Sequence, residues 1–385
     1  MNSYSRQNFL KITHLKIEEI PAWVILLIAG LLYLPLIFLG YGSDSDSYNV
    51  VRTGQYFVQT LDYLPSRLPG YFVHEVFVYF LNLIGGSIAC NLGTLAMTLL
   101  MLGSFEDICS RLNVPHKQLL TLTFAIHPLV WVNAASTIDY LWALGFALCG
   151  IAFLLRHRYV SATILLGLAI GSRLSTVLLI LLVFAFLWWK QEGDRKQLAL
   201  CTFFTTLIAA MMYLPVLDFL EWDFSRWLVL STGDPELWTF SLRLGRFGYK
   251  NLMFWGLPAA LWMVVMIIFG FLHTHDPVKK WITGLNGLSL LVILCYEILF
   301  YSAPIEIEYL LPILPFVLIL FGLAFRSRPG FLLIFFILIL LTNFLWLNPA
   351  RSLNPNQTSE VVYGLWLEKG YLLKDISLRL SMLHP

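Results

Sequence analysis

The sequence predicts an all-α polytopic membrane protein, and three observations support this fold class. Of the 385 residues, 58% are hydrophobic and only 12% are charged, whereas soluble domains contain roughly 25% charged residues. The mean hydropathy is +0.75. Apolar runs of the length that crosses a bilayer recur along most of the chain. The net charge of +2 is small, and no basic run is interleaved with aromatic residues, so nucleic acid is not an expected partner.

A window of about 20 apolar residues per span predicts about eleven transmembrane helices. The first run follows a polar leader, and its length favours an uncleaved anchor over a signal peptide. No internal repeat and no low-complexity linker divides the series. The expected spans lie near residues 22–40, 86–104, 118–133, 140–155, 159–171, 174–189, 197–216, 251–271, 281–301, 309–325 and 330–347.

The distribution of Lys and Arg predicts the orientation of the chain in the membrane. Each segment that we assign to the cytoplasm carries at least two of these residues, whereas the outer connections at 133–139 and 302–308 carry none. The positive-inside rule then places the N-terminus in the cytoplasm and the C-terminus outside. The acids have the opposite bias, with about sixteen of 23 on the outer side. This bias favours an outward-facing polar cavity that handles sugars, phosphates or a metal ion.

The chain is expected to form one membrane domain with a tail. Residues 1–347 make up the transmembrane domain, whose first outer loop covers residues 41–87, and residues 348–385 form an outer C-terminal tail. In the tail, the polar run from Asn354 to Ser359 predicts a turn. The segment from Val361 to Arg379 is expected to form one amphipathic helix.

Asp44 and Asp46 lie where the first expected span emerges from the membrane. Acids so close to hydrocarbon are costly, and each needs a partner or a function. Apolar residues from Val50 to Leu61 recur with a helical period, so both acids fall at the N-terminus of a short interfacial helix. Helix capping accounts for one such acid. It does not account for two, so at least one is expected to serve function.

The segment Ser66–Tyr71 is the next candidate. Arg67 could clamp a phosphate group, or it could extend to lipid headgroups. Pro69-Gly70 predicts a turn. The apolar run from Phe72 to Leu83 is too short to cross a bilayer and ends at Gly85-Gly86-Ser87, so we expect a second interfacial helix in the first outer loop.

In this order, these features resemble the GT-C superfamily of membrane glycosyltransferases, which use polyprenyl-phosphate-linked sugars, as protein O-mannosyltransferases and aminoarabinose transferases do. The resemblance covers roughly residues 20–345. Three later motifs are also similar to the family: the outer acid of Ser136-Thr137-Ile138-Asp139-Tyr140, the Gly-rich helix that ends at Arg173, and the Tyr309-Leu310-Leu311-Pro312-Ile313-Leu314-Pro315 span. The chain departs from the family at Asp44-Ser45-Asp46, where an adjacent Asp-Glu is frequent, and at Glu308, where a basic residue is frequent.

The resemblance implies a GT-C type catalytic domain. It would transfer a sugar from a polyprenyl-phosphate donor to an acceptor on the extracytoplasmic face, with inversion and an Asp general base. The acceptor could be a protein, a glycan or a lipid. Spacing from Tyr48 matches Asp44 to the family's catalytic Asp, so Asp44 is the first choice for the base, and Asp46 remains open as the alternative. Asp46 could also support the base, or join Asp44 in holding a divalent metal such as Mg or Mn.

Six further residues are candidates for substrate binding, each with a structural alternative. Arg67, Tyr71 and Arg173 would contact the donor phosphate or sugar, although a helix-end Arg173 could instead extend to headgroups. Asp139 would orient the sugar or pair with Arg173, or it would cap a helix. Glu306 and Glu308 would contact the acceptor or a metal, or they would be solvated loop acids.

A secondary transporter or lipid flippase is the alternative function. Such proteins usually contain inverted repeats and place polar groups near the membrane midplane. This sequence has no evident repeat and few ionisable residues within its spans, Glu297 excepted. For location, we expect an integral multi-pass protein of a bacterial plasma membrane.

Overall fold

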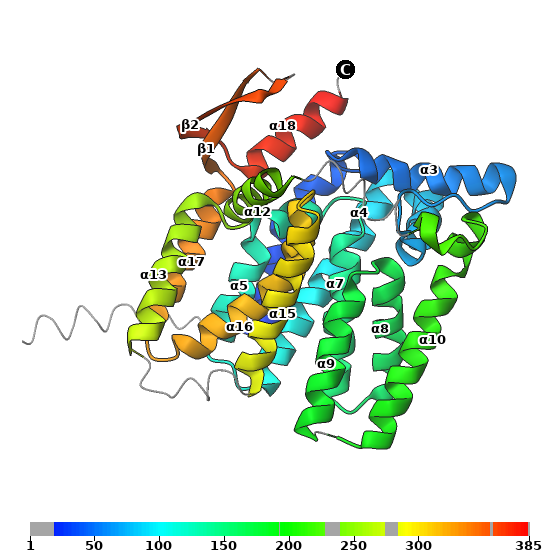
Figure 1. The fold of residues 1–385 in the computed structure, drawn as a ribbon, viewed down its shortest axis with the longest axis horizontal. Helices are drawn as coiled ribbons and strands as arrows, with labels where there is room; N and C mark the ends of the chain where they lie inside the picture. Colours follow the sequence, from blue (N-terminus) through cyan, green and yellow to red (C-terminus); the bar gives the residue numbers. More distant parts are fainter. Residues whose placement is uncertain (1–18, 192, 228–238, 274–283, 355–356, 384–385) are drawn as a thin grey trace, which may run out of the picture.

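The computed structural model describes residues 19–191, 193–227, 239–273, 284–354 and 357–383. Within these ranges, the chain is almost entirely helical and has one two-stranded antiparallel sheet. Figure 1 shows the helices packed side by side as a bundle, with the sheet, α18 (Tyr371–Leu383) and α3 (Ser45–Thr60) at the same end. The architecture is that of an all-α membrane protein.

Four described helical segments are long and apolar enough to cross a membrane. They are α4 (Phe72–Arg111), α10 (Arg195–Phe219), α15 (Gly284–Ser302), and η4 (Ile307–Ile313) with α16 (Leu314–Ala324). The bent pair α12 (Phe240–Trp255) and α13 (Leu257–His273) makes a fifth if it is one span. The shorter apolar helices are α2 (Ala22–Tyr33) with η2 (Leu34–Phe38), α7 (Tyr140–Leu155), α8 (Tyr159–Ser172), α9 (Thr176–Lys190) and α17 (Pro329–Thr342).

Every expected span contains helical structure, but length and composition support four or five spans among the described residues, not eleven. The span expected at 118–133 is broken into α5 (Lys117–Ile126) and α6 (Pro128–Asn133). The break falls at the residue before Pro128, because proline lacks the amide hydrogen and disfavours a helical residue before it.

Successive loops lie at opposite ends of the bundle, so every second loop lies at the same end. At one end, Asp107 pairs with both Arg111 and Arg156 at 2.9 Å, and a ring nitrogen of His116 lies 2.9 Å from the Arg326 carbonyl. We call this the basic end. At the other end, which we call the site end, the Thr137 amide donates to the Tyr41 carbonyl at 2.7 Å. The loops predicted to share a side of the membrane are therefore also neighbours in space.

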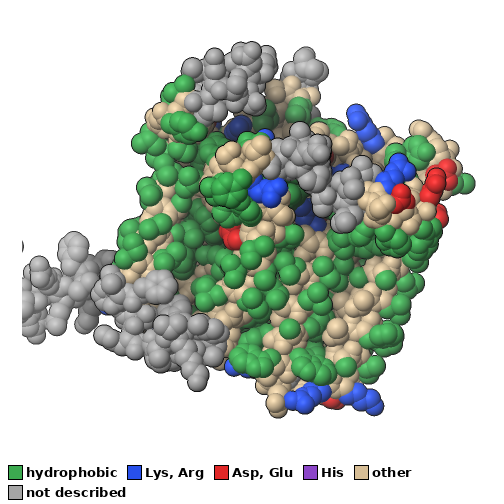
Figure 2. All heavy atoms as spheres, viewed as in Figure 1, with side chains coloured by type: hydrophobic (Ala, Val, Ile, Leu, Met, Phe, Trp, Pro, Cys, Tyr) green, Lys and Arg blue, Asp and Glu red, His purple; other side chains and the backbone are tan. Residues whose placement is uncertain are grey.

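The flanks of the bundle are apolar. Figure 2 shows hydrophobic side chains over most of the visible flank, with Lys and Arg at the basic end. Large apolar side chains such as Leu294 and Phe203 are 57% and 62% exposed. A surface of this kind is expected where lipid, and not water, surrounds the helices.

Helix α7 forms the centre of the bundle, and nearly all of its residues are buried. It packs closely on its neighbours because two glycines leave room for their side chains. A Cβ on Gly145 would lie 2.8 Å from the Met97 side chain of α4, and one on Gly150 would lie 2.6 Å from Leu166 of α8. Small residues at such contacts are typical of membrane helix packing. This packing fixes the start of α7, immediately after Asp139.

Both segments of the first outer loop that are expected to be interfacial helices are helical. Helix α3 begins directly after Asp44. The helix that begins at Phe72 is interrupted at Gly85 and Gly86, whose backbone angles are not helical, before the chain continues as a membrane helix. Gly86 has φ 58° and ψ −142°, a combination of backbone angles that residues other than glycine rarely adopt.

Replacing Gly86 with Ala is therefore expected to destabilise the protein by about 1–3 kcal/mol, the typical cost of a residue held in a sparsely populated backbone region. Thermal unfolding in detergent measures this loss. Gly245→Ala is the matched control, because Gly245 lies within α12 and a Cβ there would meet nothing within 4 Å. Equal melting temperatures for both variants would contradict the account of the kink.

Two sequence expectations about element boundaries are wrong. The span expected at 251–271 begins at Leu257, because Gly256 adopts φ 79° and turns the chain by 93° between α12 and α13. The helix expected from Val361 to Arg379 is instead a strand followed by a helix. Strands β1 (Leu345–Asn354) and β2 (Gln357–Lys369) pair antiparallel, and α18 follows.

The hairpin begins as a continuation of the last apolar run. The last expected span includes Leu345, Trp346 and Leu347, but these residues pair with residues 367–369 of β2. Asn354 and Gln357 pair in the ladder, and residues 355–356, which fall within the predicted turn, lie outside the described residues. The β-branched and aromatic residues Val361, Val362, Tyr363 and Trp366 favour a strand, and this preference competes with the helical pattern.

Candidate functional site

A network of buried ion pairs lies at the site end. Asp139 is 0% exposed and sits between two arginines. Arg173 Nη1 donates to Asp139 Oδ2 at 2.7 Å, and Arg67 Nη2 donates to Asp139 Oδ1. Through Nη1, Arg67 also donates to Asp46 Oδ2. One carboxylate thus joins the first outer loop, the start of α7 and the end of α8.

The charges of this network stabilise one another. Burial alone would raise the pKa of Asp139, but Arg67 and Arg173 outweigh it and hold the pKa below its usual value. Burial disfavours the charged forms of both arginines, yet Asp139 and neighbouring tyrosine oxygens keep the pKa of each above its usual value. All three groups therefore remain ionised at neutral pH.

Three tyrosine rings enclose the arginines. The Tyr71 ring centroid lies 4.5 Å from the Arg67 guanidinium carbon, and the Tyr140 and Tyr309 centroids lie 4.2 Å and 4.8 Å from that of Arg173. Such cation–π contacts hold a guanidinium in place in a partly dry site. They also supply the flat apolar faces on which a sugar ring can pack.

The last outer turn joins the network through Tyr140, whose hydroxyl donates to Glu306 Oε2. Glu308, two residues on, lies within electrostatic reach of Glu306, Asp44 and Lys250. Together, five carboxylates (Asp44, Asp46, Asp139, Glu306, Glu308) and three cations (Arg67, Arg173, Lys250) gather here.

Asp44 and Asp46 have different partners. Asp44 is exposed and caps α3 by accepting from the Asp46 amide at 2.9 Å. Asp46 is 18% exposed and pairs with Arg67. The capping alternative thus accounts for Asp44 and the ion pair accounts for Asp46.

The two carboxylates do not converge on a common point, since one turns to its own helix and the other to Arg67. In the described part of the chain, no three His, Cys, Asp or Glu side chains gather closely enough to hold a metal ion. That Asp44 and Asp46 hold a divalent metal such as Mg or Mn stays a prediction.

Arg67 is positioned by a second buried acid, Glu75 of α4, which is 2% exposed. Glu75 accepts from the Ser66 amide at 2.8 Å, from the Ser66 hydroxyl at 2.6 Å and from the Tyr63 hydroxyl. These bonds fix the loop that carries Arg67 against the start of α4. Such a fully bonded carboxylate orients its neighbours.

The C-terminal helix α18 holds the two acid-bearing loops together. Arg379 is 1% exposed and donates to the carbonyls of Ala135 at 2.7 Å and Val132 at 3.1 Å. It forms an ion pair with Asp375 at 2.8 Å. Asp375 in turn accepts from the Ser43 hydroxyl at 2.6 Å. The tail therefore lies directly behind both Asp44 and Asp139.

Several buried polar atoms around the network have no hydrogen-bond partner among the described residues. Arg67 Nε is one of them, and both ring nitrogens of His74 are others. The hydroxyls of Ser47 and Ser172, each adjacent in sequence to a residue of the network, complete the group. Buried polar groups are almost always satisfied in folded proteins. Around Arg67, Asp46 and Arg173 there are therefore donors and acceptors that no described residue satisfies.

The site is closed in this arrangement. The cavity beside Arg173 and Glu308 has a volume of only about 10 Å³, which is close to the space of one water molecule. It is lined by Tyr140 and Pro312 as well. A sugar could enter only if these side chains moved apart.

All eight residues predicted for the site lie at the site end. Six of them are connected by ion pairs, hydrogen bonds or cation–π contacts: Asp46, Arg67, Tyr71, Asp139, Arg173 and Glu306. Asp44 and Glu308 lie next to it. The alternatives in which Arg173 extends to headgroups and Asp139 caps a helix are not what the structure contains.

Four important residues were not predicted. Tyr140 and Tyr309 lie within the quoted motifs, but nothing in their spacing indicated that they enclose an arginine. Asp375 and Arg379 are four residues apart in the amphipathic tail, and this spacing was the available signal for a paired helix face.

The fold and this cluster define a polytopic all-α membrane protein with a buried ion-pair site at one end of its helices. Comparisons of the chain with protein-family models, with curated proteins and with solved structures found no match.

Proposed function

We propose that the protein is a membrane glycosyltransferase of the GT-C type, with about eleven spans that include the shorter apolar helices. It would transfer a sugar from a polyprenyl-phosphate donor to an acceptor at the site end, which would face away from the cytoplasm. The observation that carries the proposal is the pair of arginines, Arg67 and Arg173, held by Asp139 at the end of an apolar bundle. The unpartnered Arg67 Nε beside them offers a hydrogen bond to an anion.

In this reaction, a carboxylate accepts the proton of the acceptor hydroxyl as its oxygen bonds to the anomeric carbon. The bond from that carbon to the phosphate oxygen breaks, and the electron pair leaves with the polyprenyl phosphate. Arg67 and Arg173 stabilise the charge on the departing phosphate. Tyr71 and Tyr309 provide faces for the sugar ring.

Asp44 is the better-placed base of the two acids. Its side chain is exposed to the solvent from which a water-soluble acceptor arrives, and only one of its oxygens caps α3. The Asp46 carboxylate already balances Arg67. Asp46 therefore serves to position Arg67, whether or not this ion pair persists when the donor phosphate binds.

Because the cavity beside Arg173 is water-sized, donor binding requires the site to open. The bond between Tyr140 and Glu306 is the contact that closes the network toward the last outer turn. We expect it to break when a sugar enters, which would free Glu306 and Glu308 to meet the acceptor.

Donor binding tests the proposal without knowledge of the acceptor. Purified protein is titrated with polyprenyl-phosphate sugars, with sugar-free polyprenyl phosphate and with a neutral polyprenol, each with and without a chelator. We expect the phosphate-bearing lipids to bind at least tenfold more tightly than the polyprenol, and Arg173→Lys to weaken them by about tenfold through loss of bidentate contact.

Equal binding of phosphate-bearing lipid and polyprenol would contradict the proposal. The alternative of a transporter or lipid flippase predicts a different result, namely movement of the lipid across a sealed vesicle without chemical change. A fall in affinity with chelator would support the prediction that Mg or Mn binds at this site.

A further inference from the structure

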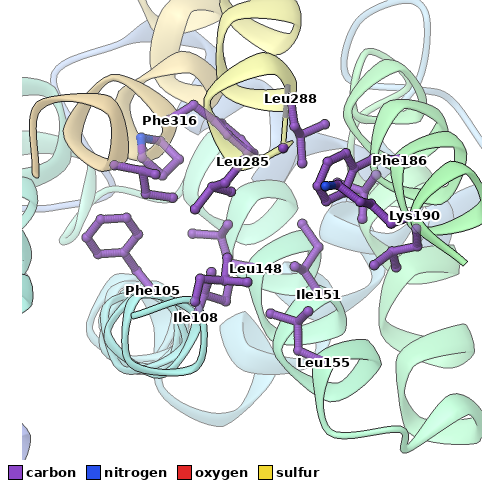
Figure 3. Close-up of a pocket in the computed structure, with 16 residues that line it drawn as sticks. Phe105, Ile108, Leu148, Ile151, Leu155, Phe186, Lys190, Leu285, Leu288 and Phe316 are labelled. Atoms are coloured by element: carbon purple, nitrogen blue, oxygen red, sulfur yellow. The ribbon is translucent and has the colours of Figure 1, made fainter. Parts of the chain in front are cut away.

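A second cavity lies at the basic end, away from the proposed site. It is enclosed by α4, α7, α9, α15 and α16 and has a volume of about 170 Å³. Figure 3 shows its aromatic and aliphatic lining, including Phe105, Leu148 and Phe316. Lys190 is the one charged residue among those that line it. An apolar cavity of this size is not a site for water, which needs polar partners.

Lys190 stands at the edge of this cavity. It is exposed at the end of α9, beside the Phe186 side chain in Figure 3. Its Nζ lies 5.4 Å from the centroid of the Trp189 ring. A Cβ on Gly284, the first residue of α15, would lie 3.8 Å from this nitrogen. The ammonium therefore reaches from the last turn of α9 to the N-terminus of α15, where backbone amides favour an anion.

A larger cavity of about 600 Å³ adjoins the first. The two share Leu112, Leu155 and Leu187 in their linings, and the larger one adds the polar side chains of Arg111 and His157. The acids near this end are outnumbered: Asp107 pairs with both Arg111 and Arg156, and Glu106 pairs with Lys117. With Lys190, the surroundings carry an excess of positive charge.

The helices on either side of the cavity also face lipid. On α9, Leu181 is 54% exposed and Trp188 is 49% exposed, and on α15, Leu291 is 45% exposed and Leu294 is 57% exposed. A hydrocarbon chain in the surrounding membrane is therefore next to the cavity. An apolar interior, a cationic edge and a lipid-facing flank together match one class of molecule.

We propose that this cavity binds an anionic phospholipid of the surrounding membrane. Part of one acyl chain enters the apolar interior, and the phosphate lies between Lys190 and the first amides of α15. A free phosphate would make no use of the apolar walls, and a zwitterionic lipid would leave the excess positive charge unbalanced. The site is independent of the proposed sugar transfer and makes no use of Asp44, Asp139 or Arg173.

Native mass spectrometry of the purified full chain tests the proposal. Protein washed in detergent is mixed with phosphatidylglycerol or with phosphatidylcholine of the same chain length. We expect one phosphatidylglycerol to bind at least tenfold more tightly than phosphatidylcholine. Lys190→Glu should weaken phosphatidylglycerol binding by about tenfold or more, and Leu148→Trp, which fills the cavity, should abolish it.

The matched control is Lys196→Glu. Lys196 is exposed on α10 at the same end and lines neither cavity, so its loss should leave lipid affinity unchanged. If Leu148→Trp does not fold, Lys190→Gln still separates the outcomes. The proposal is overturned if Lys190→Glu and Lys196→Glu weaken binding equally, or if the two lipids bind equally well. Because no sugar donor is used, neither result depends on the proposed enzyme activity.

Discussion

Asp139→Asn should destabilise the protein by about 3–5 kcal/mol, the typical cost of removing one partner from a buried ion pair. The Asp139 side chain is 0% exposed and balances both Arg67 and Arg173. Without its charge, the Arg173 guanidinium loses its ion-pair partner, and the two arginines repel each other across a dry site. The same change removes the group that orients both arginines toward a donor phosphate.

Chemical unfolding in detergent, followed by tryptophan fluorescence, measures this loss. Asp62→Asn is the control, because Asp62 is exposed in the same outer loop and its replacement should change stability by less than about 0.5 kcal/mol. A change of less than 1 kcal/mol for Asp139→Asn would show that the pairing is not maintained in the membrane protein.

The pH dependence of this loss follows from the pKa of Asp139, which lies below its usual value in the folded protein. A lowered folded pKa gives stabilisation that is complete above the usual value of about 3.9 and is lost as pH falls through the folded value. The gap between the natural protein and Asp139→Asn should therefore be constant from pH 5 to 8.

Arg379→Met should be about as damaging, again by about 3–5 kcal/mol. Arg379 is 1% exposed, and its removal leaves the buried Asp375 without its ion-pair partner. The carbonyls of Ala135 and Val132 also lose a charged donor. Because α18 is held to the acid-bearing loops by these contacts, we expect the tail to become sensitive to protease before the rest of the chain.

Lys374→Met on the exposed face of the same helix should leave both stability and protease resistance unchanged. The double variant Arg379→Met, Asp375→Leu removes both charges, so it should be more stable than Arg379→Met alone. If the double variant were less stable by the sum of the two single losses, Arg379 and Asp375 would not be acting as a pair.

The sequence predicts the membrane class and the helices well because long apolar runs leave few other structures possible. It also places the break at Gly85-Gly86, where glycine permits a backbone conformation that other residues avoid, but the span expected at 118–133 does not include the break that Pro128 causes. The hairpin is not predicted because the apolar residues between Val361 and Leu367 are compatible with a helix as well as with a strand. Short apolar segments of this kind are ambiguous from periodicity alone.

The site residues could be predicted because charged groups in an apolar chain need partners. The three ion pairs Asp46–Arg67, Arg67–Asp139 and Asp139–Arg173 join residues that are 21, 72 and 34 positions apart in the sequence, so which charge pairs with which depends on how the helices pack. The tail's part in the site was also outside the reach of the sequence, since Arg379 bonds to carbonyls, which every residue has.

The rate of sugar transfer by Asp44→Asn and Asp46→Asn is the most direct test of whether the acids at the start of α3 perform this reaction. Both variants, shown to be folded and inserted, are compared with the natural protein using the polyprenyl-phosphate sugar that binds best. Loss of a general base lowers the rate by about 10²–10⁴-fold, and we expect a loss of this size for Asp44→Asn. Full activity in both variants would contradict the account.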